Sequence, residues 1–160
     1  MKAIKTTLFL LLTVALIAGC TKHESFENIL FDCECGTITL NDRDLMIRLA
    51  EGFEPDSTNA DLWRYHVVAD FRTENEVANH MPNQDLAFTV DMSLTGASTT
   101  TNAVGALTVN EIEAQVTDAF WDVTGGDLKV DRTDSLHTLT FLNVEAGGRT
   151  INAEITIVPQ

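Results

Sequence analysis

Two cysteines one residue apart, Cys33 and Cys35, are the side chains of this sequence best placed to do chemistry. On a strand, residues two apart point to the same side, so the two sulfur atoms would be neighbours. A tetrahedral thiolate metal site needs four ligands and wider spacing. The carboxylates of Asp32 and Glu34 raise a neighbouring thiol pKa, which disfavours a reactive thiolate. We therefore expect a structural pair, with a labile disulfide, a metal site and pairing with another chain as the alternatives.

The other groups that could bind or catalyse are scattered along the chain. Each histidine is expected to be an ordinary surface or sheet residue, because no two stand at metal-ligand spacing: His23, His66, His80 and His137. Carboxylates gather in two stretches: Glu51, Glu54, Asp56 and Asp61, and then Asp118, Asp122, Asp127, Asp131 and Asp134. Neither stretch has the regular spacing of an EF-hand loop, so solvated surfaces are expected and a structural Ca²⁺ is the alternative. The sequence contains no nucleophile elbow, phosphate-binding glycine loop or His-Glu-x-x-His motif, so we predict no catalytic residue, metal site or cofactor.

The first twenty residues follow the order of a secretory signal. Lys2 and Lys5 precede a nearly continuous apolar run over residues 8–17, and small residues follow that run. The run is too short for a comfortable membrane-spanning helix, which needs about 20 apolar residues. Its end, Ile17-Ala18-Gly19-Cys20, resembles the lipobox, which is the cleavage site of bacterial lipoproteins. An uncleaved anchor and a plain cleaved signal are the alternatives.

The lipobox resemblance implies cleavage before Cys20, lipidation of its sulfur and acylation of the new amino terminus. Two or more acyl chains, worth about 0.8 kcal/mol per buried methylene, anchor a protein stably in a bilayer. Thr21 stands where an aspartate marks inner-membrane retention in that family, so the bacterial outer membrane is the expected address, on either of its faces. Residues 1–19 are then the signal peptide, 20–28 the lipidated cysteine and a polar tether, and 29–160 a single domain.

The net charge of the chain limits the classes of ligand that it is expected to bind. There are 24 acidic residues against 10 lysines and arginines, for a formal net charge of −14, and loss of Lys2 and Lys5 with the signal peptide makes it −16. An acidic surface repels nucleic acid and anionic lipid, so neither is an expected ligand. The expected partners are the lipid bilayer, through acylated Cys20, and a protein.

Strand signals fill the rest of the sequence. Two segments alternate clearly between apolar and polar residues. Their apolar faces carry Trp63, Tyr65, Val67, Ala69 and Phe71, and Leu86, Phe88, Val90, Met92 and Leu94. Their wet faces carry Arg64, His66, Asp70 and Arg72, and Thr89, Asp91 and Ser93. A polar loop is expected over residues 73–85, between the two segments.

A hairpin is predicted before these segments, across residues 41–44. In its second strand, Leu45, Ile47 and Leu49 share one face, opposite Met46 and Arg48. The final third of the chain predicts a meander over residues 128–132, 136–144 and 150–158, and the ambiguous segment 111–121 is expected to be strand. With eight to ten short strands and at most one helix, the sequence predicts an all-β antiparallel sandwich with a C-terminal meander. A small calycin-like β-barrel is the alternative.

In organisation, the chain resembles small β-rich outer-membrane lipoproteins. The function we expect is a membrane-anchored, non-enzymatic β-domain for partner binding or surface assembly. A small-ligand-binding barrel is the first alternative, and an enclosed apolar cavity would favour it. A glycan hydrolase is the second alternative, and two carboxylates converging in a cleft would favour it.

The lipobox generates a first prediction. Cys20→Ala is expected to abolish acylation and to leave the protein unprocessed or released in soluble form, because the acyl chains are its only predicted anchor. Metabolic labelling with a fatty-acid analogue measures the modification. A wild-type protein that takes up no label would show that the lipoprotein interpretation is wrong.

Overall fold

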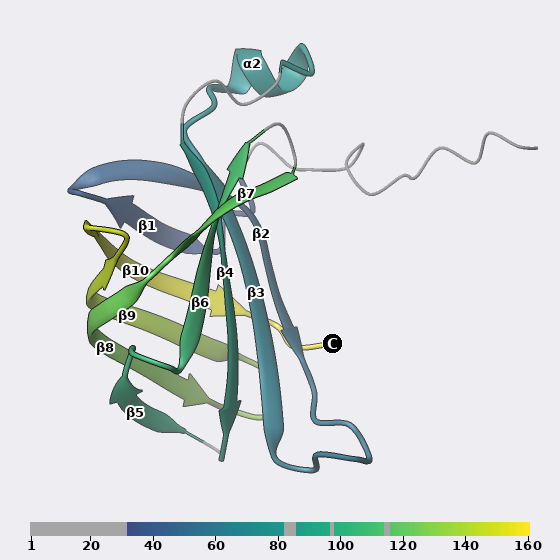
Figure 1. The fold of residues 1–160 in the computed structure, drawn as a ribbon. Helices are drawn as coiled ribbons and strands as arrows, with labels where there is room; N and C mark the ends of the chain where they lie inside the picture. The colour runs from purple at the N-terminus through teal and green to yellow at the C-terminus, as the bar shows by residue number, and fades with distance from the viewer. Residues whose placement is uncertain (1–31, 82–85, 97, 114–115) are drawn as a thin grey trace, which may run out of the picture.

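The computed structural model describes residues 32–81, 86–96, 98–113 and 116–160, so the predicted signal peptide, Cys20 and the tether lie outside the described residues. Over the described ranges the chain forms ten strands and one short helix, α2 (Glu74–Ala78) (Figure 1). The strands are β1 (Gly36–Leu40), β2 (Arg43–Phe53), β3 (Leu62–Asp70), β4 (Ala87–Thr95), β5 (Thr99–Asn102), β6 (Leu107–Glu113), β7 (Val116–Trp121), β8 (Val123–Arg132), β9 (His137–Ala146) and β10 (Arg149–Ile157). No described helix has the length and apolar character needed to cross a membrane.

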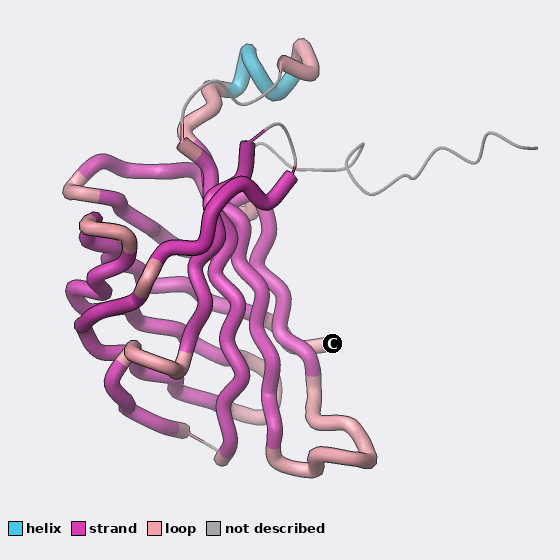
Figure 2. The backbone as a smooth tube through the Cα atoms, in the orientation of Figure 1, coloured by secondary structure: helices cyan, strands magenta, loops and turns pink. Residues whose placement is uncertain are grey.

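All ten strands belong to one antiparallel sheet, in the order β5-β8-β9-β10-β1-β2-β3-β4-β6-β7. The sheet curls into a half-barrel, which brings β5, β8, β9, β10 and β1 opposite β2, β3, β4, β6 and β7 (Figure 1). The strands of the first group run across the view and those of the second run along it (Figure 2), as in orthogonal packing. The predicted all-β antiparallel fold is confirmed, and β8, β9 and β10 form its C-terminal meander.

Two tight turns set the hairpins of the sheet. Asn41 and Asp42 join β1 to β2 with φ angles of 50° and 62°, and Gly147 and Gly148 join β9 to β10 with φ angles of 56° and 72°. Two successive residues with positive φ fit the type I′ turn, whose twist matches that of antiparallel strands. Both hairpins lie where the sequence predicts them. β1 also pairs with β10, so the first and last described strands are neighbours.

The interior is one apolar cluster that both groups of strands share. On β3 and β4, the predicted apolar faces point into it, and Val67, Phe88 and Val90 have no exposed surface. Trp63 is only partly buried, and its ring packs edge-on against His137 with 4.5 Å between ring centroids. Burial of each large apolar side chain stabilises the fold by about 1.5–3 kcal/mol, so this cluster is what keeps the sheet curled.

The predicted alternation of β2 is wrong after Ile47. The pairing with β3 shifts between Ile47 and Leu49, which marks a β-bulge at Arg48. One extra residue reverses the sides to which the following side chains point. Arg48 is therefore buried, with 3% of its surface exposed, and Leu49 faces outward with 37% exposed. Just before this bulge, β2 changes partners: its pairing with β1 ends at Leu45, and its pairing with β3 begins at Met46.

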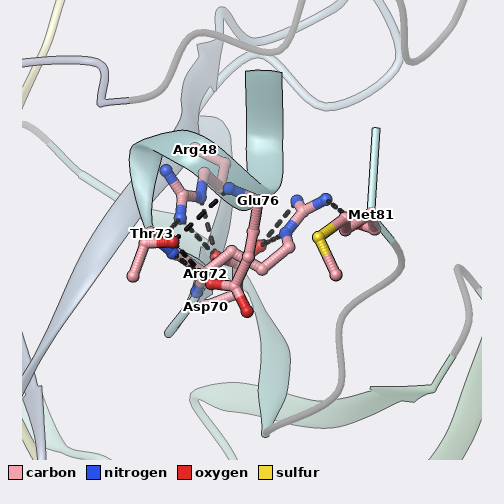
Figure 3. Close-up of polar contacts among 6 residues, drawn as sticks. All are labelled: Arg48, Asp70, Arg72, Thr73, Glu76 and Met81. Atoms are coloured by element: carbon pink, nitrogen blue, oxygen red, sulfur yellow. Dashed lines mark hydrogen bonds and ion pairs between the residues drawn. The ribbon is translucent and has the colours of Figure 1, made fainter. Parts of the chain in front are cut away.

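Asp70, which the sequence places on a wet face, is buried between two arginines (Figure 3). Its Oδ1 accepts hydrogen bonds from Arg48 Nε at 2.8 Å and Nη2 at 2.5 Å, and its Oδ2 accepts one from Arg72 Nε at 2.8 Å. Arg48 Nη2 also donates to the Arg72 carbonyl oxygen at 2.5 Å. The expectation for Asp70 is wrong because the bulge turns Arg48 inward, where its charge needs a counter-charge.

The predicted loop over 73–85 contains the helix α2. Thr73 caps its first turn, because the Thr73 hydroxyl accepts from the Glu76 backbone N–H at 3.4 Å while Glu76 Oε2 accepts from the Thr73 N–H at 2.7 Å. These hydrogen bonds from Thr73 lower the pKa of Glu76. In the same corner, Arg72 Nη1 donates to the Met81 carbonyl oxygen at 3.5 Å (Figure 3). The helix is thus tied to the buried charge cluster.

Removal of the Asp70 carboxylate is expected to be among the most destabilising changes in the domain. Asp70→Ala leaves the Arg48 guanidinium buried without its counter-charge, which costs about 3–5 kcal/mol of unfolding free energy. The control is Asp131→Ala, which breaks the exposed Lys129–Asp131 ion pair at the surface and costs less than about 1 kcal/mol. Chemical denaturation of the purified chain measures both variants. Equal losses would mean that the buried cluster does not stabilise the fold.

Candidate functional site

The outer faces of β2, β3 and β4 carry polar side chains in register. Phe53 lies opposite Arg64, and Arg64 lies opposite Ser93. In the next row, His66 lies opposite Asp91, and Asp91 lies opposite Thr108 on β6. The pairing of the strands therefore gathers a cation, a carboxylate and two hydroxyls on one face, from segments that are far apart in the sequence.

A hollow of about 450 Å³ opens on this face, and we call it the outer-face hollow. The residues of its lining that are exposed or partly exposed are Phe53, Arg64, Asp91, Ser93, Gly105, Ala106 and Thr108, and the buried Tyr65, Met92 and Leu107 also border it. Its volume lies in the range of ligand sites in proteins, about 300–1,000 Å³. Gly105 and Ala106 precede β6 and add backbone to the wall, so the hollow combines a strand-built floor with a loop at its rim.

Asp91 is held in place by neighbours on both sides. His66 Nδ1 hydrogen-bonds to Oδ1 at 2.7 Å, and Asn110 Nδ2 donates to Oδ2 at 3.3 Å. Asn110 is itself fixed by a 3.3 Å hydrogen bond to the Thr89 hydroxyl, and only 8% of its surface is exposed. Half of the Asp91 side chain is nevertheless exposed. The carboxylate is thus oriented by the sheet and still open to a ligand.

The Arg64 guanidinium faces the same hollow. The guanidinium carbon of Arg64 lies 5.9 Å from the centroid of the Phe53 ring. No hydrogen bond or ion pair joins Arg64 to another described side chain. Arg64 also helps to lower the pKa of Asp56 in the β2–β3 loop, after the larger effect of hydrogen bonds from Thr58 and Asn59. Arg64 therefore has donors to offer to a ligand.

A second polar cluster lies inside the domain, where β3, β8 and β9 meet. Arg132 Nε donates to the Tyr65 hydroxyl at 2.7 Å, and that hydroxyl hydrogen-bonds to His137 Nδ1 at 2.9 Å. Arg132 Nη1 donates to the carbonyl oxygen of Gly96, at the end of β4. Tyr65 is 2% exposed and His137 is 1% exposed. The cluster therefore ties the two groups of strands together and is closed to a substrate.

Burial favours the neutral form of both titratable groups of this cluster. It raises the pKa of Tyr65, against the opposite effect of Arg132. Burial also lowers the pKa of His137 below its ordinary value of 6.5, and the positive charge of Arg132 adds to that effect. A neutral imidazole has one ring nitrogen that can accept a hydrogen bond from the tyrosine hydroxyl. The sequence predicts that His137 is an ordinary surface or sheet residue, and it does not predict this buried hydrogen bond to Tyr65.

Cys33 and Cys35 are joined in a disulfide, with Cα atoms 5.1 Å apart. The chain around them is not extended as expected, because Glu34 has a φ of 53° and β1 begins only after the pair. The Cys33 N–H donates to the Ile47 carbonyl oxygen on β2 at 2.9 Å, and the Cys35 carbonyl oxygen accepts from the Thr156 N–H on β10 at 2.6 Å. The disulfide is anchored to two strands, and its structural role stays a prediction.

The remaining sequence candidates do not line the hollow. His80 is exposed after α2, and His23 lies outside the described residues. Within the described ranges, no group of three or more His, Cys, Asp or Glu side chains is arranged to hold a metal ion. The two acidic stretches therefore do not form a described cation site. The sequence alone does not identify Arg64, Asp91 and Asn110 as residues of a binding site, because only the pairing of β3, β4 and β6 brings them together.

The lowered pKa of His137 predicts a pH dependence of stability. As the pH falls below about 6.5, the imidazole binds a proton more readily in the unfolded chain than in the folded chain, so stability is greatest above pH 6.5 and falls as the pH decreases toward the lowered pKa of folded His137. Wild type is expected to lose more stability than His137→Asn between about pH 7.5 and about pH 5.5. The exposed His80→Asn variant serves as control and keeps the wild-type slope. The measurement is the denaturation midpoint at each pH. If the midpoints of wild type and His137→Asn change in parallel with pH, the pH dependence does not come from His137.

The chain matches no protein-family model, no curated protein and no solved structure. The chemistry of the outer-face hollow is therefore the basis on which a function can be argued. That chemistry consists of one oriented carboxylate, one guanidinium with free donors, two hydroxyls and one aromatic ring.

Proposed function

We propose that the chain is a lipoprotein of the bacterial outer membrane whose β-domain is non-enzymatic and binds a partner through the outer-face hollow. The lipobox ending in Cys20 supports the anchor. The hollow supports the binding surface. In this arrangement acylated Cys20 holds the domain at the bilayer, and the domain presents the outer face of β2, β3 and β4 to its partner.

The observation that carries the proposal is the fixation of Asp91. A surface carboxylate on a strand ordinarily moves with its side-chain rotamers, and ordering it on binding costs about 0.5–1.5 kcal/mol. Here His66 and Asn110 hold both carboxylate oxygens before any partner arrives. An oriented charge beside a guanidinium with free donors is the kind of preorganised polar group that gives a binding site its specificity.

The same residues favour binding over catalysis. Glycoside hydrolysis uses two carboxylates on opposite sides of the bond, and Asp91 is the single carboxylate among the described residues that line the hollow. Tyr65 and His137, which could transfer protons, are buried, and burial shifts the pKa of each toward its neutral form. A ligand inside the half-barrel is disfavoured as well, because apolar side chains from both groups of strands fill the interior.

Photo-crosslinking in living cells tests the proposed surface. A photoreactive residue placed at Ser93, in the hollow, is expected to give adducts with the partner, and the same residue placed at Lys129, on the exposed face of β8, is not. Arg64→Met is expected to remove the Ser93 adducts while the protein remains folded and anchored, because Arg64 is exposed and its ring contact with Phe53 lies at the surface. Equal adduct yields from both positions would exclude the hollow as the binding surface.

A further inference from the structure

We infer that the ligand of the outer-face hollow is a neutral glycan. This inference rests on the proposed binding function and narrows it to one class of ligand. Three features carry it: the mixture of donors and acceptors around the hollow, the local balance of charge, and the aromatic ring at one wall.

The polar groups of the hollow match the hydroxyls of a sugar. Each sugar hydroxyl donates one hydrogen bond and accepts others, so a pair of neighbouring hydroxyls fits best between a group that only accepts and a group that only donates. Asp91 only accepts and Arg64 only donates. The two lie diagonally across the β3–β4 pair, where side chains are about 7–8 Å apart, which leaves room for a ligand group between them.

The hydroxyls of Ser93 and Thr108 complete this set. Ser93 lies opposite Arg64, and Thr108 lies opposite Asp91. Neither side chain makes a hydrogen bond to another described residue, and both are exposed. A hydroxyl can donate or accept as a sugar requires, so all four polar groups are available at the same opening.

Charge favours a neutral ligand over an ionic one. The positive charge of Arg64 is offset within the hollow by Asp91, and Asp56 lies close enough to Arg64 for the guanidinium to lower its pKa. The chain as a whole carries a formal charge of −14, which repels polyanions. A cationic ligand would come close to the positive charge of Arg64 and be repelled by it. A neutral, hydroxyl-rich ligand is repelled neither by Arg64 nor by the negative charge of the chain.

Phe53 supplies the apolar side of the hollow. Its ring is partly buried at the end of β2 and lies beside the Arg64 guanidinium. A sugar ring has one face of C–H groups, which loses contact with water when it packs on an aromatic ring. Because the hollow is open to solvent, its ligand is a residue within a longer glycan that continues across the sheet.

The test uses the full-length lipidated chain in a zwitterionic detergent without a sugar headgroup. Isothermal titration calorimetry is carried out with hexasaccharides of glucose, mannose, galactose, xylose and N-acetylglucosamine, and with an oligogalacturonate as the acidic counterpart. At least one neutral hexasaccharide is expected to bind, more tightly than the oligogalacturonate. Arg64→Met and Asp91→Asn are each expected to weaken that binding by about tenfold or more, because each leaves a ligand hydroxyl without its partner.

Matched controls carry the same charge changes elsewhere. Lys129→Met and Asp131→Asn alter an exposed ion pair on β8 and are expected to bind the glycan as wild type does. Thermal unfolding checks that all four variants keep the wild-type fold. No binding by any neutral hexasaccharide, tighter binding of the oligogalacturonate, or equal effects of the hollow and control variants would each overturn the inference.

The crosslinking experiment separates this inference from the proposed function. Ser93 adducts that a glycosidase mixture shortens and a protease does not are expected if the ligand is a glycan. Adducts on a protein, lost in Arg64→Met, would leave the proposed binding function in place and refute the glycan. Equal crosslinking from Ser93 and Lys129 would refute both.

Discussion

The structure depends on one buried ion pair at the point where the sheet folds over. A single sheet of ten strands can bury its apolar residues only by bringing its two ends face to face, and β2 is the strand that turns from one group to the other. The bulge that follows this change of partner leaves Arg48 buried. A buried guanidinium needs a counter-charge and hydrogen-bond acceptors. Asp70 provides the counter-charge and accepts from Nε and Nη2, and the Arg72 carbonyl oxygen also accepts from Nη2. The fold-over and the ion pair are therefore two aspects of one constraint.

Two further contacts hold the facing groups of strands together away from that corner. At one, Arg132, Tyr65 and His137 connect β8, β3 and β9. At the other, the Trp121 indole N–H donates to Glu111 at 2.7 Å, and the Arg149 guanidinium lies 4.4 Å from the centre of the Trp121 ring. Because these contacts and the apolar cluster stabilise the curl, the exposed side chains of Arg64, Ser93 and Thr108 are not needed for stability. Their types can be set by a ligand.

The sequence was sufficient to predict the strands. It was insufficient to predict which side chains are buried near the bulge in β2. Alternation in β3 and β4 is a local property of one strand, so the buried faces of Val67 and Phe88 follow from the pattern alone. A bulge depends on how β2 pairs with a strand that lies beyond a loop, so the burial of Arg48 and Asp70 could not be derived from either segment by itself. The hollow has the same origin. Its charged residues were correctly placed on wet faces, but their convergence depends on the register of neighbouring strands.

The pairing of β1 with β10 has a consequence for the order in which the domain can fold. β1 lies between β2 and β10, and β10 is the last of the described strands along the chain. Contacts between the two ends of a domain form slowly, because a long loop must close before they become favourable. In a chain that emerges from its N-terminus onward, β1 therefore lacks one of its two neighbours until β10 has emerged. The topology thus delays completion of the sheet until more than 100 residues after β1 are available.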